Sequence, residues 1–112
     1  MLESTSSARI VITTVVSLEE GARIGRVLVE ERLAACATII PGAHSIYRWQ
    51  GHMESSAETV LLLKTESDRL PALDSRLHEL HSYQTPEFLV LPLESGSHAY
   101  LAWLHACVGQ GS

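Results

Sequence analysis

The chain has 112 residues, of which 46% are apolar and 19% charged, and a formal net charge of −5. This length suits one domain, and the apolar share is too high for a disordered chain. Its eight lysine and arginine residues form no run, so nucleic acid and anionic membranes are poor partners. The start lacks the basic and apolar segments of a signal peptide, and the two cysteines are expected to be reduced in a cytoplasmic protein.

The first segments predict a tail, a strand and a helix. Residues 1–8 are small and polar, which predicts a disordered tail. Residues 9–16 are rich in β-branched side chains, and their nearly continuous apolar character predicts a strand buried on both faces. Ser17 and Glu20 have the spacing of a capping box, in which each side chain bonds the other residue's amide. Helical periodicity then runs for about fifteen residues, to Leu33.

The middle of the chain predicts a long hairpin. Its first arm begins at residues 37–40, is interrupted by a bulge at Pro41-Gly42, and resumes at residues 45–49. The arm carries Tyr47 and Trp49 on one face, because side chains alternate along a strand. Gln50-Gly51 is typical of a tight turn, and residues 53–63 form the returning arm.

The last third predicts a helix, a strand and a further helix. Ser67 or Asp68 is a suitable cap for a helix that ends near His81, with Pro71 tolerated in the first turn. Residues 88–91 have the apolar character of a buried strand. A short helix follows at residues 100–106, and residues 108–112 are expected to form a loose tail.

This order predicts an α+β fold of the ferredoxin-like, split β-α-β type, with an extended β-hairpin and a C-terminal helix. Residues 9–107 form the single predicted domain. The hairpin arms near residues 44–56 are longer than the sandwich needs, so they should project with unpaired edges and exposed aromatic rings. Such edges are usually covered, and we therefore expect an oligomer.

Several side chains have both a functional and a structural interpretation. His78 and His81 are three residues apart, a spacing that suits a metal ion but also two solvated cations at a helix end. Cys36 suits a metal ligand or a nucleophile, and equally a small hydrophobic side chain. Lys64 can pair with an anion or extend to solvent, and an inward Glu87 needs a partner such as Lys64 or His81. No nucleotide-binding or nucleophile motif is present, which favours a binding domain over an enzyme.

Several blocks of the sequence, in order over residues 9–104, resemble the CutA family of divalent-cation tolerance proteins. The blocks are Glu31-Arg32-Leu33-Ala34-Ala35-Cys36-Ala37, Ile40-Pro41-Gly42-Ala43, Ser45-Ile46-Tyr47-Arg48-Trp49-Gln50-Gly51, Leu63-Lys64-Thr65, His81-Ser82-Tyr83-Gln84-Thr85-Pro86-Glu87 and Tyr100-Leu101-Ala102-Trp103-Leu104. The resemblance implies a ferredoxin-like subunit in a tight homotrimer that is similar to PII-type signalling proteins. It also implies a cytoplasmic protein linked to tolerance of copper and other divalent cations.

The resemblance further implies two sites. The family's proposed copper ligands are a thiol on the first strand and two adjacent histidines, and this chain has Thr13, Leu80 and His81 at these positions. Because threonine and leucine are not comparable ligands, we expect weak binding of copper or another divalent cation, through His81 with Cys36, Glu87 or a residue from a neighbouring subunit. The second site is a ligand cleft between subunits. It is expected to contain Tyr47, Trp49, Lys64, His81, Tyr83 and Glu87.

Three functions are therefore open. The first is a homotrimer that binds a metal ion or small ligand in the cleft and contributes to cation tolerance. The second is a PII-like signalling or scaffold trimer that binds a small anionic metabolite and has no metal role. The third is an enzyme in which His81 and Glu87 act as acid and base.

Overall fold

The structure, a computed structural model, describes residues 1–109 of the chain. Its main body contains four strands and two helices in a split β-α-β arrangement. In the sheet the order is β3-β4-β2-β5, and each neighbouring pair is antiparallel. The predicted α+β class is confirmed. The elements are β2 (Ala8–Val15), α1 (Leu18–Glu30), β3 (Cys36–Trp49), β4 (His52–Glu66), α2 (Leu70–Leu80) and β5 (Leu89–Pro92).

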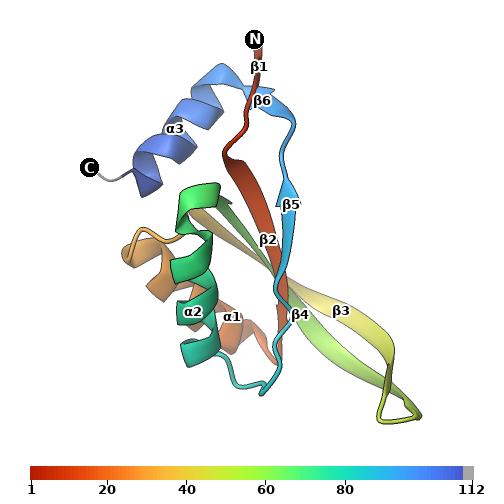
Figure 1. Cartoon of the computed structure of the whole chain (residues 1–112). Coiled ribbons are helices and arrows are strands. Elements are labelled where there is room, and N and C mark those ends of the chain that lie inside the picture. Colours follow the sequence, from red (N-terminus) through yellow and green to blue (C-terminus); the bar gives the residue numbers. More distant parts are fainter. Residues whose placement is uncertain (110–112) are drawn as a thin grey trace.

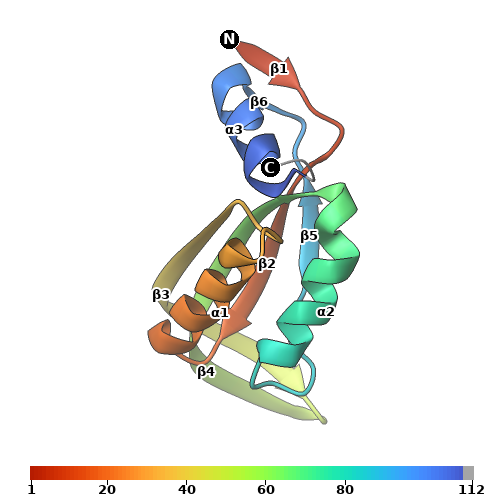
Figure 2. The same cartoon turned by 90° about the vertical axis from the view of Figure 1, so that its left-hand side faces the viewer.

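Both α1 and α2 cover the same face of this sheet (Figures 1 and 2). Alternate residues of β2 and β4 point to the helices, and Val11, Leu61 and Leu63 are fully buried there with Ile24 of α1 and Leu73 of α2. The apolar faces of the helices and of the strands therefore pack together in one core.

Within residues 1–109, no helix covers the opposite face of the sheet (Figures 1 and 2). Ile10 and Ile12 of β2 are only partly buried, so the prediction that this strand is buried on both faces is wrong for the single chain. The edge strand β5 is exposed along its whole length, although its apolar sequence predicts burial. An apolar run indicates that a strand is buried in the functional state. It does not indicate whether the same chain or another subunit buries it.

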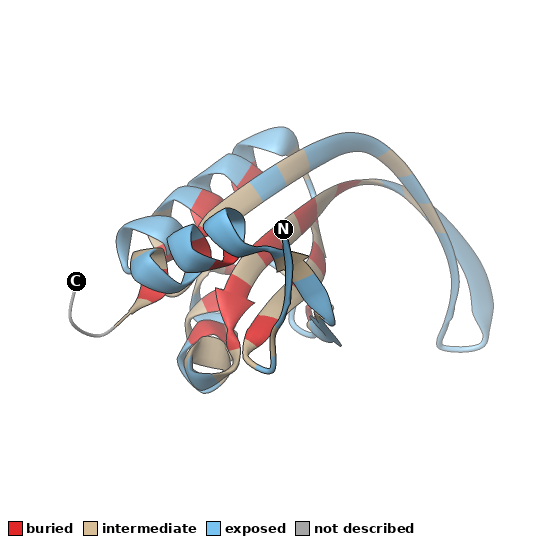
Figure 3. Cartoon of the chain, turned by 90° about the horizontal axis from the view of Figure 1, so that it is seen from above, coloured by how far each residue is buried: buried red, intermediate tan, exposed pale blue. Residues whose placement is uncertain are grey.

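Strands β3 and β4 continue beyond the helices as a curved ribbon (Figures 1 and 3). The ribbon gives the molecule extents of 46 × 25 × 22 Å. Its register shifts between Ile40 and Ala43, where Gly42 has a φ of +87°, which confirms the predicted bulge. At the tip, Gln50 and Gly51 both have positive φ angles, as a two-residue hairpin turn requires.

The helix ends differ from the predictions in detail. α1 ends at Glu30, before Leu33, because Arg32 takes a left-handed conformation with a φ of 60°. At its start, Ser17 Oγ accepts from the Glu20 amide as predicted, but the Glu20 side chain bonds other amides. No side-chain hydrogen bond caps α2, which instead follows a turn of 3₁₀ helix over Ser67–Arg69.

The termini are more ordered than the sequence predicts. Strand β1 (Leu2–Ser4) pairs with β6 (Ser95–Ser97), so the predicted disordered tail at residues 1–8 is wrong over β1. Helix α3 (His98–Val108) is longer than predicted, and its last residue is buried, so the loose tail does not begin at Val108. Residues 110–112 of that tail lie outside the described residues. Among the described residues, no helix is both long and apolar enough to cross a membrane.

Candidate functional site

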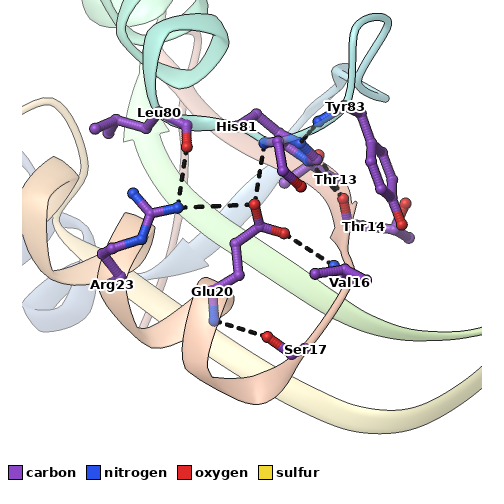
Figure 4. Close-up of polar contacts among 10 residues, drawn as sticks. Thr13, Thr14, Val16, Ser17, Glu20, Arg23, Leu80, His81 and Tyr83 are labelled. Atoms are coloured by element: carbon purple, nitrogen blue, oxygen red, sulfur yellow. Dashed lines mark hydrogen bonds and ion pairs between the residues drawn. The ribbon is translucent and has the colours of Figure 1, made fainter.

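A buried polar group lies where β2 ends and the loop after α2 returns to it (Figure 4). We call it the Glu20 cluster; it consists of Glu20, His81 and the backbone groups that they bond. The Glu20 carboxylate is 7% exposed and accepts from the amides of Val16 at 2.9 Å and Ser82 at 3.0 Å. Arg23 lies 3.7 Å from the same carboxylate but is half exposed, so this ion pair adds little. Glu20 therefore links the end of β2 to a loop that lies 62 residues beyond Glu20 in the chain.

These amide bonds determine the charge state of Glu20. Burial raises the pKa of this carboxyl, but the amides of Val16 and Ser82 stabilise its ionised form, and the pKa of Glu20 is lowered overall. Because each of its oxygens accepts a backbone amide, this carboxylate holds two segments of the fold together.

His81 is held in an equally complete set of contacts. Its Nε2 lies 2.7 Å from the Thr14 carbonyl oxygen, and the Tyr83 amide donates to Nδ1 at 3.0 Å. Because a carbonyl only accepts and an amide only donates, Nε2 carries the proton and Nδ1 offers the lone pair. Neither nitrogen is available to a metal ion or as a general base without loss of a hydrogen bond.

Tyr83 lies between this cluster and the surface. Its ring packs against His81 with the ring centroids 4.7 Å apart, and its hydroxyl donates to Glu58 Oε2 at 2.9 Å. Burial, with Glu58 as the second cause, raises the pKa of Tyr83 to about 12. Tyr83 therefore stays protonated at neutral pH and acts as a hydrogen-bond donor to Glu58.

Beyond Tyr83, the projecting ribbon and the loop at residues 83–87 enclose a hollow of about 590 Å³. We call it the hairpin hollow. Its walls include Thr14, Tyr47, Trp49, Glu58, Tyr83 and Glu87. Four of the six predicted cleft residues, Tyr47, Trp49, Tyr83 and Glu87, therefore lie around one space. Tyr47 and Trp49 are exposed, at 42% and 55%, so the hollow opens to solvent along the ribbon.

The other two predicted cleft residues lie elsewhere in the single chain. His81 is behind the Tyr83 ring and does not line the hollow. Lys64 is near the far end of β4, where its ammonium group donates to the Tyr100 hydroxyl at 3.1 Å. That hydrogen bond raises the pKa of Lys64. The expected pairing of Lys64 with Glu87 is not made within the chain.

The predicted pair of metal ligands, His81 and Cys36, does not form within the chain. His81 contacts Thr14, which is level with Ile40 in the sheet, and Cys36 lies four residues from Ile40, about 13 Å along the strand. Of the other candidates, His78 bonds Asp74 in its own helix. Among the described residues, no three His, Cys, Asp or Glu side chains are grouped as metal ligands.

The residues at the other two positions of the family's proposed copper site belong to the packed interior. Thr13 is fully buried and Leu80 packs against the hydrophobic core. Sequence reasoning missed Glu58 as a residue of the site. The feature that could have identified it is its pairing with Ala43, at the point where the ribbon leaves the sandwich. It also did not identify the contact between Glu20 and Ser82, because nothing local to either residue indicates it.

Comparison with known proteins gives a consistent result. A sequence model of the CutA1 divalent ion tolerance protein family matches residues 9–107. The divalent-cation tolerance protein CutA of Thermus thermophilus is 46% identical over 100 residues, which cover 89% of this chain and 97% of that protein. The solved structure of CutA from Synechococcus elongatus matches with a TM-score of 0.93 and 37% identity, over 97% of this chain and 96% of that one.

A second structure of the Synechococcus protein is complexed with a Bis-Tris molecule. It matches with a TM-score of 0.89 and 36% identity, over 96% of this chain and 99% of that one. Relatives differ in cellular location: the Arabidopsis thaliana protein is named chloroplastic and the Archaeoglobus fulgidus structure is described as periplasmic.

Proposed function

The chain belongs to the CutA1 divalent ion tolerance protein family, and from this premise we propose that it is a cytoplasmic homotrimer that takes part in divalent-cation tolerance. Each hairpin hollow would form one wall of a cleft between subunits that binds a small ligand or ion. The observation that carries this proposal is the hollow itself, a space of about 590 Å³ with exposed aromatic rings at the base of a projecting ribbon. Small-molecule sites typically have this size and lining.

The uncovered face of the sheet supports assembly. Leu89 and Leu91 of β5 are 57% and 48% exposed, and Ile46 and Met53 of the ribbon are 69% and 62% exposed. Burying apolar area of this kind gains about 25 cal/mol per Å², and an exposed edge strand offers unpaired backbone groups to another chain. A second copy of the chain supplies both kinds of contact.

Light scattering of the purified chain tests the assembly. We expect a mass of about three times 12.3 kDa. Leu91→Glu should dissociate the trimer, because it places a charge on the edge strand. Leu18→Glu, at a similarly exposed leucine on α1, is the matched control and should leave the mass unchanged. A monomer at micromolar concentration for the unmodified chain would contradict the proposal.

The donor set limits how a metal ion would be held. The copper site that the family resemblance implies does not fit this chain, since both His81 nitrogens are bonded and Thr13 and Leu80 belong to the core. The carboxylates of Glu58 and Glu87 remain, and these are ligands for harder cations than copper.

The alternative of an anionic metabolite needs a cation that the hollow does not have. Lys64 is the predicted candidate, and within one chain it bonds Tyr100. An anion site would therefore depend on Lys64 of a neighbouring subunit. Calorimetry with Zn²⁺, Mg²⁺ and inorganic phosphate, each against the unmodified trimer and Trp49→Leu, separates these ligands. Binding that Trp49→Leu leaves unchanged would contradict the placement in the hollow.

A further inference from the structure

The charged side chains that line the hairpin hollow are all acidic. Its lining contains two carboxylates, Glu58 and Glu87, and none of the eight lysine and arginine residues of the chain. All eight lie within the described residues, so this statement covers every basic side chain except the histidines. Because no histidine lines the hollow either, a bound anion would face only negative charge from this chain.

The two carboxylates differ in how well they are compensated. Glu58 accepts the Tyr83 hydroxyl through Oε2. The Glu87 carboxylate makes no hydrogen bond or ion pair with any other residue among 1–109, although the residue is partly buried. Burial raises the pKa of Glu87, and the negative charge of Glu58 raises it further. A cation in the hollow would relieve both effects, because it would pair with Glu87 and offset the negative charge of Glu58.

Aromatic rings form the rest of the recognition surface. Tyr47 and Trp49 occupy alternate positions on one face of β3, and Tyr83 stands on the loop opposite them. The face of an aromatic ring attracts a cation, tryptophan most strongly, and substituted ammonium groups are well suited because they also offer apolar surface. Tyr83 is fixed in place by its bond to Glu58 and its contact with His81, so its part of the wall is preformed.

Size distinguishes an organic cation from a bare metal ion. A hollow of about 590 Å³ lies within the usual range for small-molecule sites. A metal ion would need several converging ligands, and no group of three or more such side chains occurs in the described part of the chain. The hollow therefore matches a ligand with both a positive charge and an apolar body.

We propose that the hairpin hollow binds a small organic cation, a substituted ammonium group held between Trp49 and Tyr47 and neutralised by Glu58 and Glu87. This inference rests on the proposed function, in which the hollow is the ligand site, and it names the class of ligand.

Calorimetry on the full chain in cacodylate buffer, which contains neither an amine nor phosphate, tests the ligand class. The probes are tetramethylammonium, choline, and 3,3-dimethylbutan-1-ol, a neutral molecule with the shape of choline. We expect choline to bind about tenfold more tightly than the neutral analogue, because the two differ in charge and share their shape. Equal affinities of choline and the neutral analogue would overturn the proposal.

Variants locate the binding. Glu87→Gln and Trp49→Leu should each weaken choline binding about fivefold, as expected for loss of one charge or one cation–π contact. Glu94→Gln removes an exposed charge outside the hollow and is the matched control, expected to change nothing. Circular dichroism of each variant establishes that it is folded. Unchanged choline affinity in Glu87→Gln and Trp49→Leu would show that the cation binds elsewhere and would overturn the proposal.

Two further results separate this inference from the proposed function. If the organic cations are silent but Zn²⁺ or phosphate binds and Trp49→Leu abolishes the signal, the ligand site stands and the cation class is wrong. If choline binds only after Lys64→Met, then Lys64 of a neighbouring subunit already fills the hollow. That result would overturn the proposal that the hollow binds a free organic cation. Silence of every probe in all variants would remove the ligand role altogether.

Discussion

The Glu20 cluster and the hairpin hollow are separated by one side chain, Tyr83, and they differ in how their polar atoms are used. In the cluster, both Glu20 oxygens and both His81 nitrogens have partners at 2.7–3.0 Å. In the hollow, Glu87 has no partner among the described residues, and Tyr47 and Trp49 are exposed. A polar group with all its bonds made stabilises the fold, whereas an unpaired group in a concave site is available to a ligand.

This comparison reverses the roles that the residue types alone indicate. Histidine is the commonest side chain at metal and catalytic sites, which is why the sequence indicates His81 as a ligand. The contacts of His81 show that it supports Tyr83, which lines the hairpin hollow. Glu87, which has no distinctive sequence signal, lines the hollow directly. If the comparison is right, substitutions in the cluster change stability and substitutions in the hollow change binding.

The largest expected effect is on stability, from Glu20→Gln. The variant keeps one acceptor but turns an amide group toward a backbone N–H, so a charge-assisted hydrogen bond is lost and a donor is left without a partner. We expect the free energy of unfolding to fall by about 2–3 kcal/mol at neutral pH. Denaturant titration at one fixed protein concentration measures it, because subunit assembly also contributes to apparent stability.

The lowered pKa of Glu20 also predicts how the stability effect of Glu20→Gln changes with pH. Because the pKa of Glu20 is lowered in the folded protein, its contribution is present above the unfolded value near 4.5 and is lost as pH falls through the folded value. The stability difference between the unmodified chain and Glu20→Gln should therefore shrink in acid. Glu19→Gln, at the exposed neighbouring position, is the control and should change stability by less than about 0.5 kcal/mol. Equal effects of both substitutions would contradict a structural role for Glu20.

The second prediction concerns His81→Ala, which removes both bonds of the imidazole. It should lower stability by about 1–2 kcal/mol, because the Tyr83 amide loses its side-chain acceptor and the Thr14 carbonyl loses its shorter side-chain hydrogen bond. It should leave the affinity for copper within about twofold, since neither ring nitrogen is free to bind a metal. Calorimetry with Cu²⁺ measures this, with His78→Ala as the control for an exposed histidine. A tenfold loss of copper affinity in His81→Ala alone would restore the metal role.

The elements of the body are predictable from the sequence because their signals are local. The capping residue Ser17, the bulge at Gly42 and the turn at Gln50-Gly51 each depend on the conformation of one or two residues. The alternation of side chains along a strand likewise places the rings of Tyr47 and Trp49 on one face of β3. Tyr47 and Trp49 therefore line the hollow together. Tyr83 and Glu87, which line it from the loop, were expected there from the family resemblance and not from a local pattern.

The failures share a different cause, which is contact between distant parts of the chain. The capping-box spacing predicts that Glu20 bonds its own helix start, but it bonds Ser82 across 62 residues. The β1 segment has no strand-forming sequence of its own, and β6 supplies its partner from the other end of the chain. The apolar sequence of β5 predicts burial, and whether the strand is covered depends on assembly, which no local pattern encodes.

The smallest expected effect is that of Tyr83→Phe, and it tests the boundary between the two regions. The pKa of Tyr83 is raised from 10.0 to about 12, by burial and then by Glu58. Of the three tyrosines, one should therefore ionise late in an alkaline titration followed by phenolate absorbance, and Tyr83→Phe should remove that late step. Tyr100→Phe is the control and should keep it.

The same shift predicts a modest stability effect with a defined pH range. A phenol whose folded pKa is raised contributes stability that is complete below the unfolded value near 10 and is lost as pH rises through about 12. At neutral pH, Tyr83→Phe should cost about 1 kcal/mol, since one hydrogen bond to a carboxylate is lost and Glu58 remains accessible to water. Choline affinity should fall slightly or not at all, because the aromatic ring stays. A large loss of binding with unchanged stability would show that the Tyr83 hydroxyl itself contacts the ligand.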